Sequence, residues 1–239
     1  MENQKNKFNE FIKKNKFFAS KKLGQNFLTN EIIKQKIVDS LNINDSDFVL
    51  EIGPGFGALT KLILKKSKNL TVIELDKRLV EFLKEEFPNL KIINQDILKF
   101  DFNNLALNNY KIISNLPYSI SSQIIFKILK HSNFSEAILM VQKEMAERVV
   151  AKAGTKKYNN FTILLNLTSN ITKLFNVSNS CFFPKPEVES TVIKFSKKEN
   201  FDFKNFDILE DFLKKCFLQK RKTLFNNLKK FYSKEKITD

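Results

Sequence analysis

The stretch Glu51–Gly57, which reads EIGPGFG, decides the fold of this chain. It holds three of the five glycines in the sequence and directly follows the apolar run Phe48–Leu50. Glycine permits a sharp turn and a close approach of the backbone to a ligand, because it has no Cβ. The residues that follow place Leu59, Leu62 and Ile63 on one face of a helix. A strand, a glycine turn and a helix start predict a nucleotide-type site in a doubly wound α/β sheet.

A carboxylate follows this turn at the distance expected for a ribose ligand. Glu74 closes the apolar run Leu70–Ile73 and lies about 20 residues after Gly53. An acidic side chain at that offset is placed to accept hydrogen bonds from two ribose hydroxyls. The pattern therefore predicts a cofactor that contains adenosine. Because Gly53, Gly55 and Ala58 also satisfy the dinucleotide pattern, NAD is an alternative at this point.

The overall charge indicates a polyanionic partner. The chain has 239 residues, of which 42% are hydrophobic, enough for one large α/β domain and a small appendage. Lysine and arginine total 41 against 26 acidic residues, which gives a net charge of +15. Such an excess favours nucleic acid as the partner. The alternative is compositional drift, which accounts for abundant lysine more easily than for the shortage of acids.

Other classes of site find little support in the composition. The two cysteines, Cys181 and Cys216, form no CxxC pair, and the single histidine, His131, ends a helical stretch. We therefore expect no disulfide framework and no metal site. No run approaches about 20 apolar residues, so we expect no membrane partner and a cytoplasmic location. A monomer is also expected.

Strand and helix patterns alternate along the chain. We expect strands at 48–53, 70–75, 91–95, 110–114 and 137–141, and helices at 30–41, 57–67, 77–87 and 120–131. This alternation predicts a mostly parallel sheet with helices on both faces and ligands at the carboxyl ends of the strands. We expect a lysine-rich basic arm at 1–22, an α/β domain at 23–196 and a small basic helical domain that binds RNA at 197–239.

The segment Asn115–Tyr118, NLPY, is the most discriminating motif, and it ends the fourth expected strand. Pro117 restricts Leu116 to extended geometry, which fixes the direction of the Leu116 carbonyl. The Asn115 side-chain oxygen and this carbonyl then converge as two acceptors, and Tyr118 supplies a flat face for stacking. This combination suits the exocyclic amino group of a nucleobase. A simple turn after a strand is the alternative.

Four motifs occur in an order that resembles a known family. They are GQNFL at 24–28, EIGPGFGALT at 51–60, NLPY at 115–118 and FFPKPEVES at 182–190. Together they are similar to the signature set of the KsgA/Erm ribosomal RNA adenine N6-dimethyltransferases, and QKRKTL at 219–224 resembles a basic segment near the family's C-terminus. The resemblance implies a Rossmann-like S-adenosylmethionine-dependent methyltransferase sheet with a small C-terminal helical domain. It also implies S-adenosylmethionine as the methyl donor and an RNA adenosine as the acceptor.

The resemblance assigns donor-binding roles residue by residue. The expected set is Asn26, Leu28, Glu51, Gly53, Gly55, Glu74, Leu75, Asp96, Ile97 and Asn115. Within it, Glu74 would hold the ribose hydroxyls, and Asp96, with Ile97 beside it, would bind the adenine. Asn26, Leu28 and Gly53 would contact the methionine and loop side of the donor. Glu51 is expected to steady the methionine amino group through water.

The expected catalytic set is Asn115, Leu116, Pro117, Tyr118 and Phe182. Methyl transfer from a sulfonium needs no strong acid or base, so positioning and electrostatics govern the step. Two acceptors on the N6 hydrogens favour a more pyramidal nitrogen and steady the cation that forms. The target base must leave its stack, and the resemblance implies that Tyr118 and Phe182 clamp it from two sides. Phe183 is the alternative to Phe182, because most of the 25 phenylalanines must lie in the core.

The resemblance favours small-subunit rRNA as the substrate. The expected activity is dimethylation of two adjacent adenosines in the 3′-terminal hairpin of 16S rRNA, in a pre-30S particle, during small-subunit biogenesis. Leu116 fits the KsgA branch, because Erm enzymes more often have isoleucine there. The alternatives are an Erm-type 23S rRNA methyltransferase that gives macrolide resistance, an RNA-binding assembly factor with secondary catalysis, and an NAD-dependent dehydrogenase.

Overall fold

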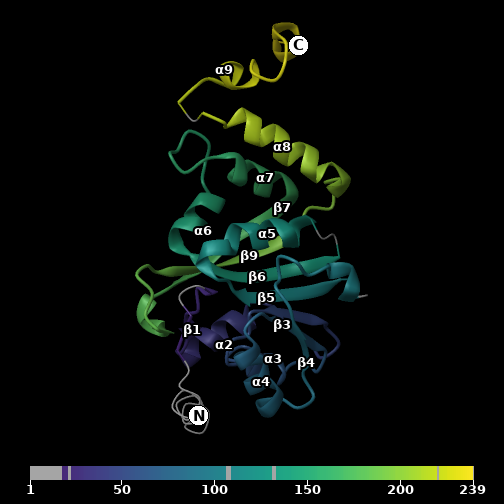
Figure 1. Cartoon of the computed structure of the whole chain (residues 1–239), viewed down its shortest axis with the longest axis vertical. Coiled ribbons are helices and arrows are strands. Elements are labelled where there is room, and N and C mark those ends of the chain that lie inside the picture. Colours follow the sequence, from purple (N-terminus) through teal and green to yellow (C-terminus); the bar gives the residue numbers. More distant parts are fainter. Residues whose placement is uncertain (1–17, 21–22, 106–108, 131–132, 220, 239) are drawn as a thin grey trace.

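The structure is a computed structural model that describes residues 18–20, 23–105, 109–130, 133–219 and 221–238 (Figure 1). Most of the basic arm expected at 1–22 lies outside the described residues, as does His131.

A mixed sheet forms the centre of the described part of the chain (Figure 1). Its seven strands follow the order β4-β3-β2-β5-β6-β9-β7. They are β2 (Val49–Ile52), β3 (Leu70–Glu74), β4 (Lys91–Asn94), β5 (Tyr110–Asn115), β6 (Phe134–Gln142), β7 (Ser169–Val177) and β9 (Ser190–Lys197). The pairs from β4 to β6 are parallel, whereas β9 is antiparallel to both β6 and β7. The mostly parallel α/β sheet predicted from the sequence is confirmed.

The central strands read as apolar runs because helices cover both faces of the sheet. Neighbouring residues of β5 show the arrangement, since Ile112 and Ile113 are both buried but belong to different core clusters. One cluster contains Ile124 of helix α5 (Ser121–Lys130), and the other contains Ile37 of helix α2 (Glu31–Asp39). Successive side chains of a strand point to opposite faces of the sheet, so Ile112 and Ile113 pack against helices on opposite sides. The remaining helices are α3 (Thr60–Ile63), α4 (Lys77–Glu86), α6 (Lys143–Val149), α7 (Asn160–Thr168), α8 (Phe206–Cys216), α9 (Leu224–Leu228) and α10 (Lys234–Thr238).

Two elements differ most from the sequence prediction in length. The helix expected at 57–67 is reduced to α3, Thr60–Ile63, because Gly57 has a φ of 72° and cannot join an α-helix. The strand expected at 137–141 is the longer β6. Its pairing with β9 runs from Glu136 to Gln142, so the antiparallel neighbour extends it.

The C-terminal helices lie at one end of the molecule, with α8 next to α7 and α9 farther out (Figure 1). Phe206 and Leu213 of α8 are buried in the same cluster as α5 and α7. Helix α8 therefore shares the core of the α/β body, and a separate domain beginning at 197 stays a prediction. No helix among the described residues is long and apolar enough to span a bilayer.

Candidate active site

A cavity of about 1050 Å³ lies at the carboxyl ends of β2, β3 and β5. Its lining includes all four motifs: Leu23–Leu28, the loop from Gly53 to Phe56, the segment Asn115–Tyr118, and the pair Phe182 and Phe183. Its volume is at the upper end of that usual for small-molecule sites. The fold thus brings together segments that lie far apart in the sequence.

The N-terminal motif packs directly on the glycine loop. Phe27 belongs to the two-residue strand β1 (Phe27–Leu28), and its ring meets that of Phe56 edge-on at 4.7 Å. A Cβ added to Gly55 would lie only 3.0 Å from Phe27 Cδ1, and Gly55 has a φ of 60°. Glycine is therefore needed at position 55 both for the backbone conformation and for the close approach of Phe27.

Glu74 is held rigidly at the end of β3. Its Oε1 accepts a hydrogen bond from the Asp76 backbone N–H at 2.9 Å, and its Oε2 accepts one from the Gly55 N–H at 3.2 Å. Burial raises the pKa of Glu74 above its usual value, although these two hydrogen bonds oppose the shift. Each carboxylate oxygen can accept a second hydrogen bond, so Glu74 has acceptor capacity left for two hydroxyls. This geometry fits the ribose role expected from the sequence.

Glu51 places a carboxylate in β2, a strand that is otherwise apolar. Only 2% of the residue is exposed, and its Oε2 accepts a hydrogen bond from Thr60 Oγ1 at 2.6 Å. Burial, reinforced by the nearby charge of Glu74, raises the pKa of Glu51 from 4.5 to about 8. The donor-free protein therefore holds Glu51 mostly protonated at neutral pH, and a cationic amino group in the cavity would favour its ionised form.

The pKa of Glu51 predicts a pH dependence of stability. A carboxyl whose pKa is higher in the folded state stabilises the fold at low pH, and this contribution disappears as pH rises through about 8. The free energy of unfolding of the donor-free protein should fall by about 3–5 kcal/mol more between pH 4.5 and 8.5 than that of Glu51→Gln. Urea titrations at several pH values measure the difference. Parallel pH profiles of the two proteins would contradict the assignment.

The residues expected at the adenine, Asp96 and Ile97, line the same cavity. Asp96 follows β4, and its Oδ1 accepts a hydrogen bond from the Leu98 backbone N–H at 2.8 Å. This bond fixes the orientation of the Asp96 carboxylate, which can accept a hydrogen bond from an amino group. Leu75 is 48% exposed, while Ile97 is buried at 7%, and both line the cavity.

The carboxamide of Asn115 has a defined orientation. Its Nδ2 donates a hydrogen bond to the Asn26 backbone carbonyl at 2.9 Å. Because a carbonyl oxygen can only accept, the nitrogen of the carboxamide must face Asn26. The side-chain oxygen is then left as a free acceptor in a residue that lines the cavity. The neighbouring residue Leu116 lines the cavity as well, and its N–H donates to the Met140 carbonyl at 3.1 Å.

Tyr118 is held by the fourth motif. Its hydroxyl and Ser190 Oγ are 2.7 Å apart and share a hydrogen bond. Burial raises the pKa of Tyr118 above its usual value, so the phenol is neutral at physiological pH. The ring is therefore fixed at its far end while it lines the cavity.

Phe182 and Phe183 form the short strand β8, which pairs with β1. Phe182 is 5% exposed and packs in the core cluster that contains Leu28, although it also lines the cavity. Phe183 is 53% exposed and lines the cavity too. Phe182 is thus a fixed part of the wall with little free surface, and Phe183 carries the exposed ring.

Sequence reasoning gave no role to three residues that support this site. Ser190 holds Tyr118, Asp76 donates its N–H to Glu74, and Gln25 bonds to the Asp76 side chain at 2.9 Å. The sequence could have indicated a role for Asp76, because aspartate is a preferred N-cap residue and Asp76 directly precedes an expected helix. Gln25 and Ser190 were within quoted motifs, but their partners are distant in sequence. Within the described ranges, no group of His, Cys, Asp and Glu side chains is arranged to hold a metal.

Comparisons with known proteins show which proteins this chain resembles. The model of the ribosomal RNA adenine dimethylase family matches residues 16–239. A ribosomal RNA small subunit methyltransferase A from Malacoplasma penetrans is 70% identical over 237 residues, which cover 99% of this chain and 87% of that protein. The protein of the same name from Ureaplasma parvum is 47% identical over 231 residues, covering 92% of this chain and 83% of its own length.

Two solved structures are similar as well. A dimethyladenosine transferase from Plasmodium falciparum superposes with a TM-score of 0.77 at 38% identity, covering 85% of this chain and 74% of that one. The 23S rRNA methyltransferase ErmE gives a TM-score of 0.71 at 22% identity, covering 89% of this chain and 87% of its own. At that identity, the second similarity shows the fold alone, which is the Rossmann-like sheet that the sequence predicts.

Proposed function

The chain belongs to the ribosomal RNA adenine dimethylase family, and on that premise we propose that it dimethylates N6 of two adjacent adenosines in the 3′-terminal hairpin of 16S rRNA. It is an rRNA adenine dimethyltransferase that uses S-adenosylmethionine as methyl donor, as the sequence predicts. The names of the 70% and 47% identical relatives support the small subunit as the target. We further propose that it acts as a monomer, in the cytoplasm, on a pre-30S particle.

The orientation of Asn115 is the single observation that carries this proposal. Its free side-chain oxygen and the Leu116 carbonyl provide two acceptors for the two N6 hydrogens of adenine. Bonds to these hydrogens withdraw the nitrogen lone pair from the ring and stabilise positive charge as the N–C bond forms. The donor supplies an activated methyl group, so no general base is required. Water takes the proton afterwards.

The remaining residues position the two reactants. Glu74 holds the ribose side of the donor, while Glu51 and Asp96 are placed for its amino groups. Tyr118 stacks on the everted adenine, with its ring fixed by Ser190. Holding both reactants in one geometry lowers the barrier because it removes most of the entropy cost of their encounter.

A second aromatic ring is expected on the face of the everted adenine opposite Tyr118, and experiment can assign it to Phe182 or Phe183. We propose Phe182, because a ring held by core packing is a rigid wall, and stacking is worth about 1–3 kcal/mol per base. Phe182→Leu, which keeps an apolar side chain of similar size, should lower kcat/KM for RNA by about 5- to 100-fold. Phe183→Leu should change it less than threefold. Steady-state methylation assays on 30S particles compare the two variants, and a larger loss for Phe183→Leu would move the role to Phe183.

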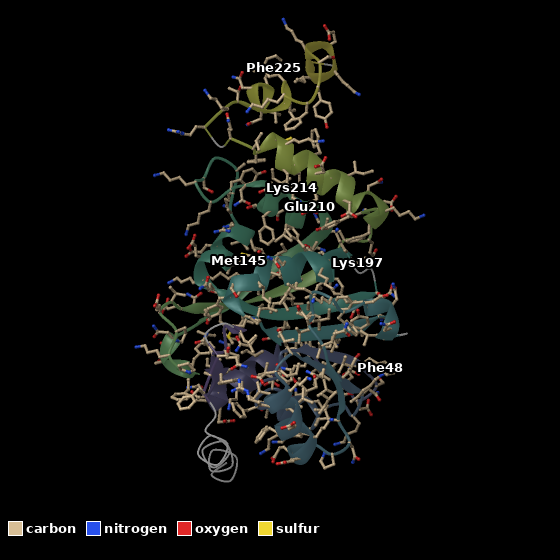
Figure 2. The ribbon with its side chains drawn as sticks, in the orientation of Figure 1. Phe48, Met145, Lys197, Glu210, Lys214 and Phe225 are labelled. Atoms are coloured by element: carbon tan, nitrogen blue, oxygen red, sulfur yellow. The ribbon has the colours of Figure 1, made fainter. Side chains whose placement is uncertain are left out.

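The C-terminal helices are proposed to bind RNA phosphates. Lys214 and Lys215 form i,i+4 ion pairs with Glu210 and Asp211 on α8, and Figure 2 shows Lys214 beside Glu210. Four exposed cations near α9 form no ion pair within the part of the chain that the structure describes: Arg221, Lys222, Lys229 and Lys230. These four cations are better placed to replace counterions on a phosphate backbone.

This difference predicts a matched pair of salt dependences. Replacing Arg221 and Lys222 by glutamine should reduce the slope of log K against log[salt] for rRNA binding by about 1.5. The control variant, with Lys214 and Lys215 replaced by glutamine, should change the slope by less than half as much, because intramolecular acids already neutralise both lysines. Filter binding at several salt concentrations gives the slopes. Equal changes in both variants would refute the assignment.

Mass spectrometry of rRNA tests the function itself. A strain without this protein should lack both N6-dimethyladenosines at the 3′ end of 16S rRNA, and the purified protein should restore them. Intact 16S dimethyls together with an unmodified 23S adenosine would show the Erm-type activity instead. Returning an active or an inactive copy to the same strain separates catalysis from assembly. If only the active copy restores particle assembly, methylation is the main role. If the inactive copy restores assembly as well, the protein acts mainly as an assembly factor.

A further inference from the structure

Gln25 connects the N-terminal motif to the loop after β3. Its Nε2 donates to Asp76 Oδ2 at 2.9 Å, and its Oε1 accepts from the Ser20 backbone N–H at 2.8 Å. Both ends of the Gln25 carboxamide are therefore fixed. The two bonded side chains come from segments 51 residues apart in the sequence.

Asp76 is itself immobilised. Its carboxylate caps α4 by accepting from the Arg78 backbone N–H at 3.1 Å, and it forms a bidentate pair with the Arg78 guanidinium at 2.9 and 2.6 Å. Burial alone would raise the pKa of Asp76, but hydrogen bonds from Arg78 and Gln25 bring it below its usual value. Asp76 is thus a charged, buried acceptor to which Gln25 is anchored.

The anchored segment also touches the acceptor motif. Asn26, the residue after Gln25, offers its carbonyl to Asn115 Nδ2 at 2.9 Å. On the other side of Gln25, a Cβ added to Gly24 would lie 3.4 Å from Pro117 Cβ. The Asn26 side of Gln25 is therefore bonded to Asn115, and the Gly24 side lies close to Pro117.

We propose that Gln25 and Asp76 are positioning residues for methyl transfer, whose hydrogen bond holds the Asn26 carbonyl where it orients the Asn115 carboxamide. This inference rests on the proposed function, since it assigns the free Asn115 oxygen to the N6 amine of the target base. Asp76 also donates its backbone N–H to Glu74 Oε1, so one residue connects the donor's ribose ligand to the acceptor's orienting group. Without the Gln25–Asp76 bond, the Asn26 carbonyl is free to move and the carboxamide to rotate.

Kinetics of Gln25 variants test this connection. Gln25→Ala should lower kcat about tenfold, because the acceptor geometry is lost, while the donor dissociation constant changes less than threefold. Donor affinity is largely retained because Glu74 and Asp96 are fixed at strand ends. The control is Gln35→Ala, which removes a similar Gln–Asp bond, 2.9 Å to Asp39, on the exposed side of α2 and should leave kcat unchanged.

A double variant that exchanges the amide and the carboxylate between positions 25 and 76 distinguishes a positioning role from general structural damage. Gln25→Glu alone should be as slow as Gln25→Ala, because two carboxylates would face each other. Adding Asp76→Asn should raise kcat at least threefold above that of Gln25→Glu alone, since the Asn amide can donate to the new carboxylate. Recovery should stay partial, because Asp76 Oδ2 also accepts from Arg78 Nη2 at 2.6 Å and an amide nitrogen cannot do so. No recovery in this double variant, with both proteins folded by circular dichroism, would overturn the proposal.

A readout independent of activity separates this inference from the proposed function. In the donor-free protein, the side-chain amide protons of Asn115 should exchange slowly with solvent by NMR and faster in Gln25→Ala. If the wild type fails to methylate 16S rRNA, the function is wrong, but the exchange still tests the Gln25–Asp76 connection. Unchanged exchange together with unchanged kcat in Gln25→Ala would refute it.

Discussion

Asn115→Ala should lower kcat for methylation by about 10²–10³-fold while the donor still binds. The variant removes the acceptor that favours a pyramidal N6 and stabilises the developing positive charge. A single preorganised hydrogen-bonding group of this kind is worth about 3–4 kcal/mol in other enzymes. RNA affinity should stay within a factor of about three, because phosphate contacts supply most of it.

Single-turnover methylation of 30S particles, with donor binding measured by calorimetry, provides the comparison. Asn176→Ala is the control, because Asn176 lies in β7 and accepts from Thr191 Oγ1 at 3.0 Å rather than lining the cavity. It should methylate at the rate of the wild type. An Asn115→Ala protein that keeps more than a third of the wild-type rate would remove the physical basis of the proposed mechanism.

Glu74→Ala should weaken donor binding at least 100-fold. The wild-type carboxylate is placed for two hydroxyl donors, and each hydrogen bond to a charged group is worth about 1.5–3 kcal/mol. The variant also leaves the Gly55 and Asp76 N–H groups without their acceptor, which disturbs the glycine loop directly. Both effects act in the same direction on the dissociation constant.

Calorimetric titration with S-adenosylmethionine, and separately with NAD, measures this effect. The wild type should bind the former and not the latter, which tests the dehydrogenase alternative at the same time. Glu81→Ala, an exposed acid on α4, serves as the control and should bind the donor normally. A Glu74→Ala protein with a dissociation constant within threefold of the wild type would show that the ribose is held elsewhere.

The parallel strands and the helices between them could be predicted from the sequence, because each is marked by apolar periodicity within its own segment. The apolar run before Gly53 and the acid at Glu74 are each followed by helical periodicity, and the structure places both at strand ends. Strands β7 and β9 were not predicted, and their places in the sheet depend on long-range pairing, of β9 with β6 and of β7 with β9. The length of α3 was overestimated because the positive φ of Gly57 is not visible in the residue name.

The candidate site shows the same difference between local patterns, which could be predicted, and long-range contacts, which could not. Motifs were found at the correct strand ends, but contacts between motifs were not predictable. Phe182 and Phe183 are the same residue type side by side, and only the pairing of β8 with β1 buries one and exposes the other. Likewise, no local signal connects Gln25 with Asp76, since their bond depends on where two distant segments meet.

The contact between Phe27 and Gly55 has a consequence for how this protein can change over evolution. A methyl group at position 55 would collide with the aromatic ring at position 27, so the nucleotide loop is constrained by its own N-terminal neighbour as well as by its cofactor. A smaller residue at position 27 would therefore remove the steric part of this constraint on position 55, whereas the φ of 60° would still favour glycine there. Directed-evolution libraries that vary position 55 should therefore recover mostly glycine, with a few more alternatives when position 27 also carries a smaller residue.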